Sequence, residues 1–291
     1  MASLSELQNK IKGIKSIEQV TRAMQLVAGA RFARAQKEMA AAGSFVTKLE
    51  GLLYRLLHTH RKSGKKAPLF PFLSENKSSD RLGLLVIAGD RGLCGGFNNN
   101  VLKETLAFRH IASEKKLNIF TVGRKAEESL RKSGLDISRV YDNIPSGLRF
   151  NIAVKMADDI MDVYLKEELG GFMVISNRFH SIARQVVEIS HLLPVRIQPE
   201  PKPKTGADYL FEPEKNSLLA ELIPCYLKTR VYSFLKESYA AEQAARLVAM
   251  ENATLNAGDL IETLNLEFNK LRQASITSQI ADIVGASEGI K

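Results

Sequence analysis

The stretch that most resembles a chemical site is a glycine-rich turn, Gly-Asp-Arg-Gly-Leu-Cys-Gly-Gly-Phe-Asn, at residues 89–98. It follows a short apolar run and precedes an amphipathic run, so it would join a strand to a helix. Turns of this kind bind phosphate groups in many α/β proteins. The residues of interest in it are Gly89, Asp90, Arg91, Gly92, Gly95, Gly96 and Asn98.

The glycine spacing of this turn does not match either common phosphate-binding motif. It is not GxGxxG, and it lacks the Gly-Lys-Ser/Thr ending of a P-loop. A backbone nest for an anion stays open as an alternative. The spacing favours a tight turn, in which glycines supply positive φ and allow close packing.

Other reactive side chains form no recognisable constellation. The two cysteines, Cys94 and Cys225, have no CxxC or zinc-like spacing. The five histidines show no HExxH pattern and no pairing with a nucleophile. We therefore expect no catalytic residues, no metal and no cofactor.

Charge and hydropathy limit the kinds of partner. The chain has 291 residues and a net charge of +9, which implies anionic partners such as nucleic acid, a lipid surface or acidic protein faces. No run of eighteen apolar residues predicts a membrane span. The N-terminus has no apolar signal-like region, so we expect a cytosolic or peripheral protein.

A long first helix is predicted from Ser3 to about residue 60. Ser3 and Glu6 form a capping-box pattern, and apolar residues then recur with a seven-residue period. The two series are Leu4, Ile11, Glu18, Gln25, Phe32, Met39, Val46, Leu53 and Leu7, Ile14, Thr21, Ala28, Ala35, Ala42, Leu49, Leu56. Glu18, Thr21 and Gln25 interrupt the seam, so that turn should face either water or a partner with polar groups.

The middle of the chain alternates short apolar runs with amphipathic runs, which is typical of a Rossmann-like α/β layer with a mostly parallel sheet. Expected strands are 82–88, 117–122, 136–141, 171–176 and 185–189, and expected helices are 98–113, 124–132 and 152–169. Linkers rich in charge, proline and glycine are expected at 61–68 and 199–206.

The C-terminal stretch from about residue 217 to 284 reads as one helix about 100 Å long. No single core can surround that length, so most of the helix must project and pack against a partner helix or another protein. We therefore expect an α/β fold plus a long α-helical coiled coil, in which the two terminal helices pair antiparallel. The predicted domains are 1–62, 80–198 and 210–291.

The basic residues of the first helix are consistent with two kinds of partner. Nucleic acid is one, although the aromatic interleaving of a recognised nucleic-acid module is missing. Acidic protein surfaces are the other. On the last helix, Arg272 and Gln273 offer a guanidinium fork and an amide to carboxylates.

Three segments together resemble the γ subunit of F-type ATP synthase, over almost the whole chain. They are Ile-Lys-Ser-Ile-Glu-Gln-Val-Thr-Arg-Ala-Met-Gln-Leu-Val at 14–27, the turn at 89–98, and Asn-Lys-Leu-Arg-Gln-Ala-Ser-Ile-Thr at 269–277 with Ile-Val-Gly-Ala at 283–286. Each segment alone would be moderately specific, and the combination is highly specific.

The resemblance implies a non-catalytic rotor shaft. In this family the terminal helices form a coiled coil inside a hexamer of α and β subunits, and the α/β domain contacts the ε subunit and the membrane c-ring. By analogy, Arg272, Gln273 and Thr277 would meet loops of the hexamer. Met24 and Arg22 would face acidic lever segments of the catalytic subunits. No nucleic acid is implied.

The chain departs from the family at Gln279, where an acidic residue is usual. The start at Met1 without a transit peptide indicates a bacterial protein at the cytoplasmic face of the plasma membrane, peripheral through its complex. Two alternatives stay open: a nucleotide-binding α/β enzyme and a basic coiled-coil protein that binds nucleic acid.

Overall fold

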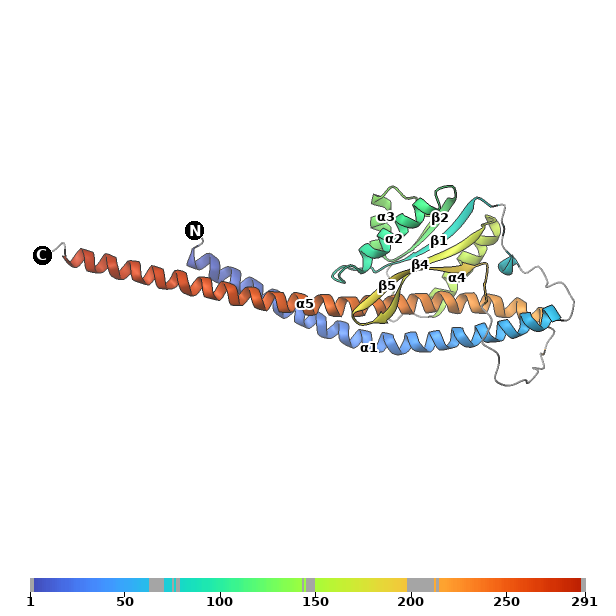
Figure 1. Cartoon of the computed structure of the whole chain (residues 1–291), viewed down its shortest axis with the longest axis horizontal. Helices are drawn as coiled ribbons and strands as arrows, with labels where there is room; N and C mark the ends of the chain where they lie inside the picture. Colours follow the sequence, from blue (N-terminus) through green and yellow to red (C-terminus); the bar gives the residue numbers. More distant parts are fainter. Residues whose placement is uncertain are drawn as a thin grey trace. The chain divides into compact units, whose positions relative to one another are not determined.

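The computed structural model describes residues 3–62, 71–74, 76, 79–142, 144, 150–197, 212 and 215–288. Its elements, shown in Figure 1, are α1 (Leu4–Lys62), η1 (Pro71–Leu73), β1 (Arg81–Ile87), α2 (Phe97–Ile111), β2 (Lys116–Val122), α3 (Arg124–Lys132), β3 (Arg139–Tyr141), α4 (Phe150–Lys166), β4 (Gly171–Ser181), β5 (Arg184–Leu193) and α5 (Lys215–Glu288). Every expected helix and strand is present; α3 has the expected bounds, and one or both ends of each of the others are shifted. Residues 63–68 and 199–206 of the expected linkers lie outside the described residues.

The chain forms two compact units, and both long helices pass through both of them. The helix-pair unit comprises Met1–Gly29 and Arg246–Lys291, and the α/β unit comprises Ala30–Ala245. The three domain boundaries expected from the sequence stay a prediction.

The seven-residue pattern of α1 is confirmed by burial. The buried residues of α1 all belong to the two predicted series, and they are Leu7, Ile11, Thr21, Ala28, Phe32, Ala35, Ala42, Val46, Leu49, Leu53 and Leu56. The capping box is also confirmed, because the Ser3 amide donates to Glu6 and the Glu6 amide donates to the Ser3 hydroxyl. Together these contacts satisfy two amides at the start of the helix.

The helix-pair unit is an antiparallel pair with a thin apolar seam. Leu7 and Ile11 of α1 pack with Leu264 of α5. Further along α1, the Thr254 hydroxyl donates to Thr21 Oγ1 at 2.8 Å, so the residue number on α5 falls as that on α1 rises. The expected polar interruption at Thr21 therefore meets a polar side chain of this chain's own α5.

The α/β unit is built on a five-stranded sheet in the order β3-β2-β1-β4-β5. β1 pairs in parallel with β2 and β4, and β2 pairs in parallel with β3. The mostly parallel sheet is therefore confirmed. β4 and β5 form an antiparallel hairpin, and β4 extends through residues 177–181, which are polar apart from Phe179, beyond the strand expected from the sequence.

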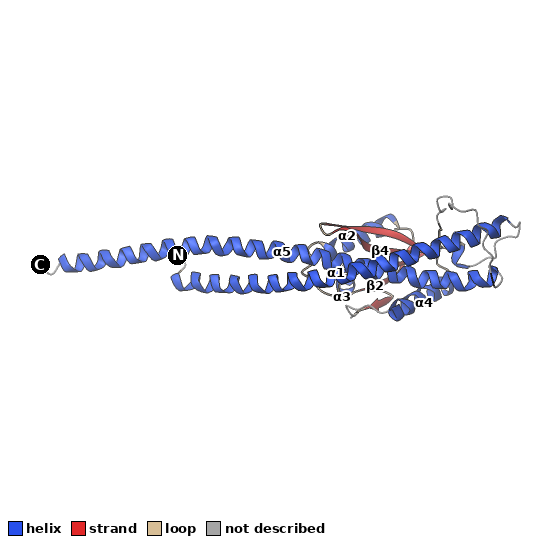
Figure 2. Ribbon diagram, turned by 90° about the horizontal axis from the view of Figure 1, so that it is seen from below, coloured by secondary structure: helices blue, strands red, loops and turns tan. Residues whose placement is uncertain are grey.

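Two helical layers cover the sheet. Alternate residues of β1 point to opposite faces, so Leu84 and Val86 join a core with α2 and α3, whereas Leu85 and Ile87 join a core with the long helices and α4. The residues that the long helices and α4 contribute include Leu53, Leu56, Met156, Ile160, Leu227 and Val231. Within the α/β unit, Figure 2 shows α1 and α5 running side by side. The sheet therefore holds both long helices along one face.

Candidate functional site

The glycine-rich turn is closed by its own side chains. Asn98 lies in the first turn of α2, and its Oδ1 accepts a hydrogen bond from the Gly89 amide at 2.9 Å. Its Nδ2 donates to the Arg91 carbonyl at 3.2 Å and lies 3.3 Å from Cys94 Sγ. The amide of Asn98 thus fills the inside of the loop, where an anion-binding nest would hold its ligand.

The acidic residue of the turn contributes to the start of a neighbouring helix. Asp90 Oδ1 accepts a hydrogen bond from the Arg124 amide at 3.0 Å, in the first turn of α3. A carboxylate in this place satisfies an unpaired amide and complements the helix dipole. Gly95 has φ of 58°, as the tight-turn interpretation requires. Arg91, Gly92 and Gly96 lie on the exposed side of the turn.

The crevice in which a fold of this kind binds a ligand is filled by α5. Crevices open at the carboxyl ends of adjacent strands where the strand order reverses, here between β1 and β4. Cys94 and Phe97 are buried there against Ala241 of α5, with Phe179 of β4 packed on the same cluster. A Cβ atom built on Gly89 would lie 3.0 Å from the Glu242 carboxyl group. These contacts favour the tight turn over a nucleotide site.

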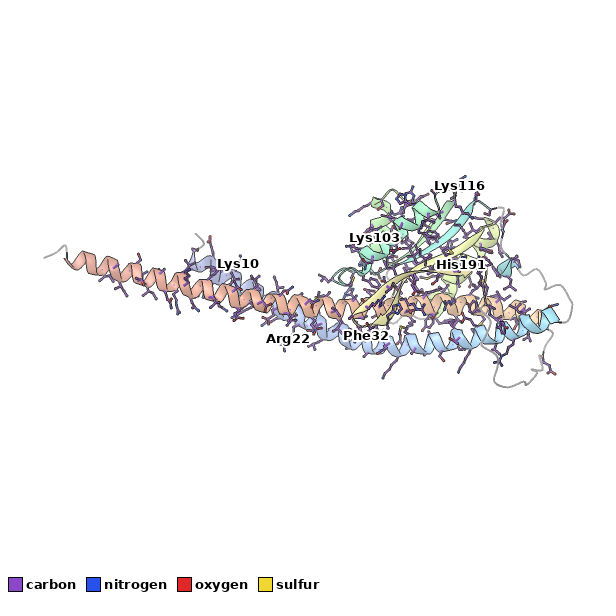
Figure 3. All side chains as sticks on the ribbon, viewed as in Figure 1. Lys10, Arg22, Phe32, Lys103, Lys116 and His191 are labelled. Atoms are coloured by element: carbon purple, nitrogen blue, oxygen red, sulfur yellow. The ribbon has the colours of Figure 1, made fainter. Side chains whose placement is uncertain are left out.

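The residues assigned to partner contacts lie on the helix-pair unit. Arg22, Arg272, Gln273 and Thr277 are exposed, and Met24 is half-buried. Figure 3 labels Arg22 on α1. The Thr277 hydroxyl donates to the Gln273 carbonyl at 2.9 Å, one turn back along α5. All five residues are therefore at least partly accessible, and their contacts with another protein stay a prediction.

Exposed apolar residues extend this surface, and the sequence reasoning did not single them out. On α1, Ile17, Val20 and Val27 are exposed at spacings that place them on one face with Met24. The signal was available, because these residues form a second apolar series outside the buried seam. Such a stripe on an exposed helix face indicates a surface that another protein covers.

The last turns of α5 carry a similar stripe. Ile276, Ile280 and Ile283 are 48%, 56% and 69% exposed, and their spacing keeps them on one helix face. Figure 2 shows α5 continuing past the N-terminal end of α1, so this segment runs without its antiparallel neighbour. A single apolar-striped helix needs a covering partner to be stable in water.

The described residues contain neither a metal-binding cluster nor a helix suited to cross a membrane. No group of three or more histidine, cysteine or acidic side chains is placed to hold a metal ion among the residues that the structure describes. Over the same residues, no helix combines the length and the apolar character that crossing a membrane requires.

The fold and the exposed helix surfaces together define a class of protein that acts by contacting other proteins. It is an antiparallel pair of long helices with an inserted α/β unit whose ligand crevice is closed by its own helix. A family model described as ATP synthase matches residues 3–290. The chain belongs to the ATP synthase gamma chain family.

Similar proteins agree with this assignment. The ATP synthase gamma chain of Chlorobium phaeobacteroides is 36% identical over 299 residues, and the match covers 100% of both chains. That of Geobacter metallireducens is 35% identical with the same coverage. A chain from the Euglena gracilis mitochondrial ATP synthase, in an OSCP/F1/c-ring structure, has a TM-score of 0.68 at 18% identity, covering 99% of this chain and 94% of that chain. This last likeness supports the fold alone.

Proposed function

We propose that this chain is the central rotor shaft of an ATP synthase. The helix-pair unit turns inside a hexamer of α and β subunits, and the α/β unit meets the ε subunit and the c-ring. The shaft itself carries out no chemistry. It passes rotation of the ring to the catalytic β subunits as changes of conformation.

The observation that carries this proposal is the exposed apolar stripe at the end of α5. Ile276, Ile280 and Ile283 lie on a helix segment without an antiparallel neighbour, so an apolar sleeve supplied by other subunits would cover them. The exposed Arg272 and Gln273 lie at the start of the same segment. There they can donate to carboxylates or carbonyls of the surrounding hexamer.

A second contact would form around Met24. This residue lies with Ile17 and Val20 on the exposed apolar stripe of α1, whereas the basic Arg22 projects from a different side of the helix. Met24 would meet the acidic lever segments of the catalytic subunits through this apolar face, and Arg22 would meet their acidic groups from the other side of the helix. The complex would lie at the cytoplasmic face of a bacterial plasma membrane, with this chain peripheral to it.

The direct test of the proposal is co-purification. The tagged chain is co-expressed with the α and β subunits of the same organism, and the purified material is assayed for ATP hydrolysis. We expect a large complex that hydrolyses ATP and contains fewer copies of this chain than of α or β. Recovery of the chain alone, without α, β or ATPase, would contradict the rotor proposal.

The double variant Arg272→Ala, Gln273→Ala tests the proposed contact with the hexamer. Loss of charge-assisted hydrogen bonds of this kind costs about 1.5–3 kcal/mol, which corresponds to on the order of tenfold or more in an equilibrium or a rate. We expect ATP turnover, or the yield of assembled complex, to fall by about that factor. Folding of the isolated chain should change by less than about 0.5 kcal/mol, because both side chains are exposed.

The matched control for this pair is Glu262→Ala, Asn265→Ala. These two residues are also exposed on α5, within the paired part of the helix. The control should leave ATP turnover close to that of the unmodified complex. If the Arg272, Gln273 variant assembled fully and kept full turnover, these residues would not form the proposed contact.

A further inference from the structure

We propose that one junction in the α/β unit, at the carboxyl ends of β1 and β4, is the joint through which torque passes into α1 and α5. The inference rests on the rotor role proposed above and assigns a mechanical task to the turn at 89–98. The junction comprises two contacts, one made by the turn and one made by the β4–β5 hairpin.

The first contact joins the turn to α5. Cys94 and Phe97 are 2% and 4% exposed, and they pack against Ala241, whose side chain is fully buried. The small side chain of Ala241 lets the turn approach the helix closely. Beside Ala241, the Glu242 carboxyl group lies close to the Gly89 backbone. If Gly89 carried a side chain, its Cβ atom would be 3.0 Å from that carboxyl group.

The second contact joins the hairpin to both long helices. The rings of Phe179 on β4 and Phe32 on α1 have their centroids 5.4 Å apart (Figure 3 labels Phe32). Arg178 precedes Phe179 on β4, and its Nε lies 3.8 Å from a carboxylate oxygen of Glu237 on α5. The hairpin therefore contacts α1 through an aromatic pair and α5 through an ion pair.

A buried hydrogen bond ties the two contacts to each other. Asn177 of β4 is 2% exposed, and its Nδ2 donates to the Phe97 carbonyl at 3.5 Å. A load on the hairpin is thus shared with the turn. Because the junction contacts α1 and α5 at separate points, it can apply a pair of opposed forces, which is what turning two helices about their common axis requires.

The position of the junction fits this task. Phe32 is close to Ala30, where the α/β unit begins on α1, and Ala245, the last residue of that unit on α5, packs on the same cluster as Cys94. Elsewhere the sheet contacts the long helices mainly through apolar side chains. Apolar packing is non-directional, whereas ion pairs, hydrogen bonds and aromatic pairs have preferred geometries and so favour one orientation.

The test uses the complete membrane-bound complex carrying Asn98→Ala with Arg178→Ala. Removing the Asn98 side chain leaves the Gly89 amide and the Arg91 carbonyl without their partner in the turn. Local opening of the turn should rise on the order of tenfold, because a part-buried group has lost its hydrogen bond. Faster hydrogen exchange in a peptide covering 89–98 would report this opening.

The decisive readout is proton pumping per ATP hydrolysed in inverted membrane vesicles. We expect the double variant to hydrolyse ATP as detached F1 at the unmodified rate, and to lose pumping per ATP in the membrane. The matched control is Asn118→Ala, which also removes a part-buried side-chain amide and its hydrogen bond, here from Nδ2 to Glu167 Oε2 at 2.6 Å, but at the amino ends of the strands. Its pumping per ATP should equal that of the unmodified complex.

Each other outcome of this experiment has a defined meaning. An unchanged ratio in assembled complexes with the double variant overturns the joint, as does an equal loss of pumping in the Asn118 control. If the double variant fails to assemble, Arg178→Ala alone decides, because this side chain is 57% exposed and its removal leaves the core intact. If the unmodified chain forms no ATPase complex at all, the rotor role itself is wrong.

Discussion

Replacing Gly123 by alanine is expected to destabilise the α/β unit by about 3 kcal/mol or more. Gly123 joins β2 to α3, with φ of 88° and ψ of 139°, a backbone conformation that only glycine adopts at low cost. An added Cβ would also lie 2.3 Å from the Ala88 carbonyl oxygen, so backbone would have to move. Conformational strain of about 1–3 kcal/mol is added to an overpacking cost of about 1–3 kcal/mol.

Gly134→Ala separates these two costs. Gly134 also has positive φ, 74°, but an added Cβ would meet nothing within 4 Å. It follows α3 in a Schellman motif, in which the Leu135 amide donates to the Leu130 carbonyl. Its replacement should cost only about 1 kcal/mol. Urea unfolding of the isolated chain measures both values, and equal losses at the two positions would show that the backbone clash at Gly123 has no effect.

The helical part of the fold could be predicted from the sequence because its signals are local. Leu49, Leu53 and Leu56 follow a seven-residue period that needs no knowledge of the partner helix, and the capping box spans only Ser3 to Glu6. The strands were found for the same reason, as short apolar runs between turns. The hairpin of β4 and β5 was harder, because β4 continues through residues 177–181, which are polar apart from Phe179 and carry no clear strand pattern.

The turn at 89–98 shows where local reasoning ends. Its tight-turn conformation followed from its glycines, and Gly95 has the positive φ expected. The packing of the turn against Ala241 and Glu242 did not follow, because these residues lie about 150 residues further along the chain. Contacts over such separations depend on the whole topology.

The candidate partner surface was predicted by resemblance more than by physics. The side-chain chemistry of Arg272 and Gln273 indicated carboxylate partners, the resemblance named the hexamer as the partner, and the structure adds that both residues are exposed. The exposed stripe of Ile276, Ile280 and Ile283 was missed, because apolar residues at helical spacing normally indicate a buried seam. Only the start of α1 at Leu4 shows that, within the part of the chain that the structure describes, α1 does not extend alongside these residues.

Glu38→Ala is expected to destabilise the α/β unit by about 3 kcal/mol, the lower end of the range for breaking a buried ion pair. The Lys236 ammonium on α5 lies 2.6 Å from Glu38 Oε2 on α1, and the Lys236 side chain is only 3% exposed. Without Glu38, its positive charge stays buried with the Tyr232 ring 5.1 Å away as a weaker partner. We use the lower end of the range for buried ion pairs because the Glu38 side chain is 31% exposed, so water reaches one side of the pair.

The double variant Glu38→Leu, Lys236→Met separates two quantities. One is the net contribution of the ion pair to the free energy of unfolding, and the other is the cost of leaving one charge buried without its partner. Two apolar side chains of similar size remove both charges and their desolvation costs together, so the unfolding free energy should return to near that of the unmodified chain. Urea unfolding of the single and double variants gives the comparison. A double variant as unstable as Glu38→Ala would mean that packing around these side chains, and not the unpaired charge, causes the loss.

The same pair should make stability depend on pH in the acid range. The hydrogen bond from Lys236 holds the pKa of the Glu38 carboxyl below its usual value of 4.5, against the opposing effect of burial. A carboxyl with a lowered pKa in the folded state stabilises that state above its unfolded pKa, and this contribution is lost as pH falls through the folded pKa. The difference in unfolding free energy between the unmodified chain and Glu38→Gln should therefore be constant from about pH 7 down to about pH 5 and should shrink below that. A difference that stayed constant down to about pH 3 would mean that Glu38 gains nothing from ionisation, and the pair would then act through packing alone.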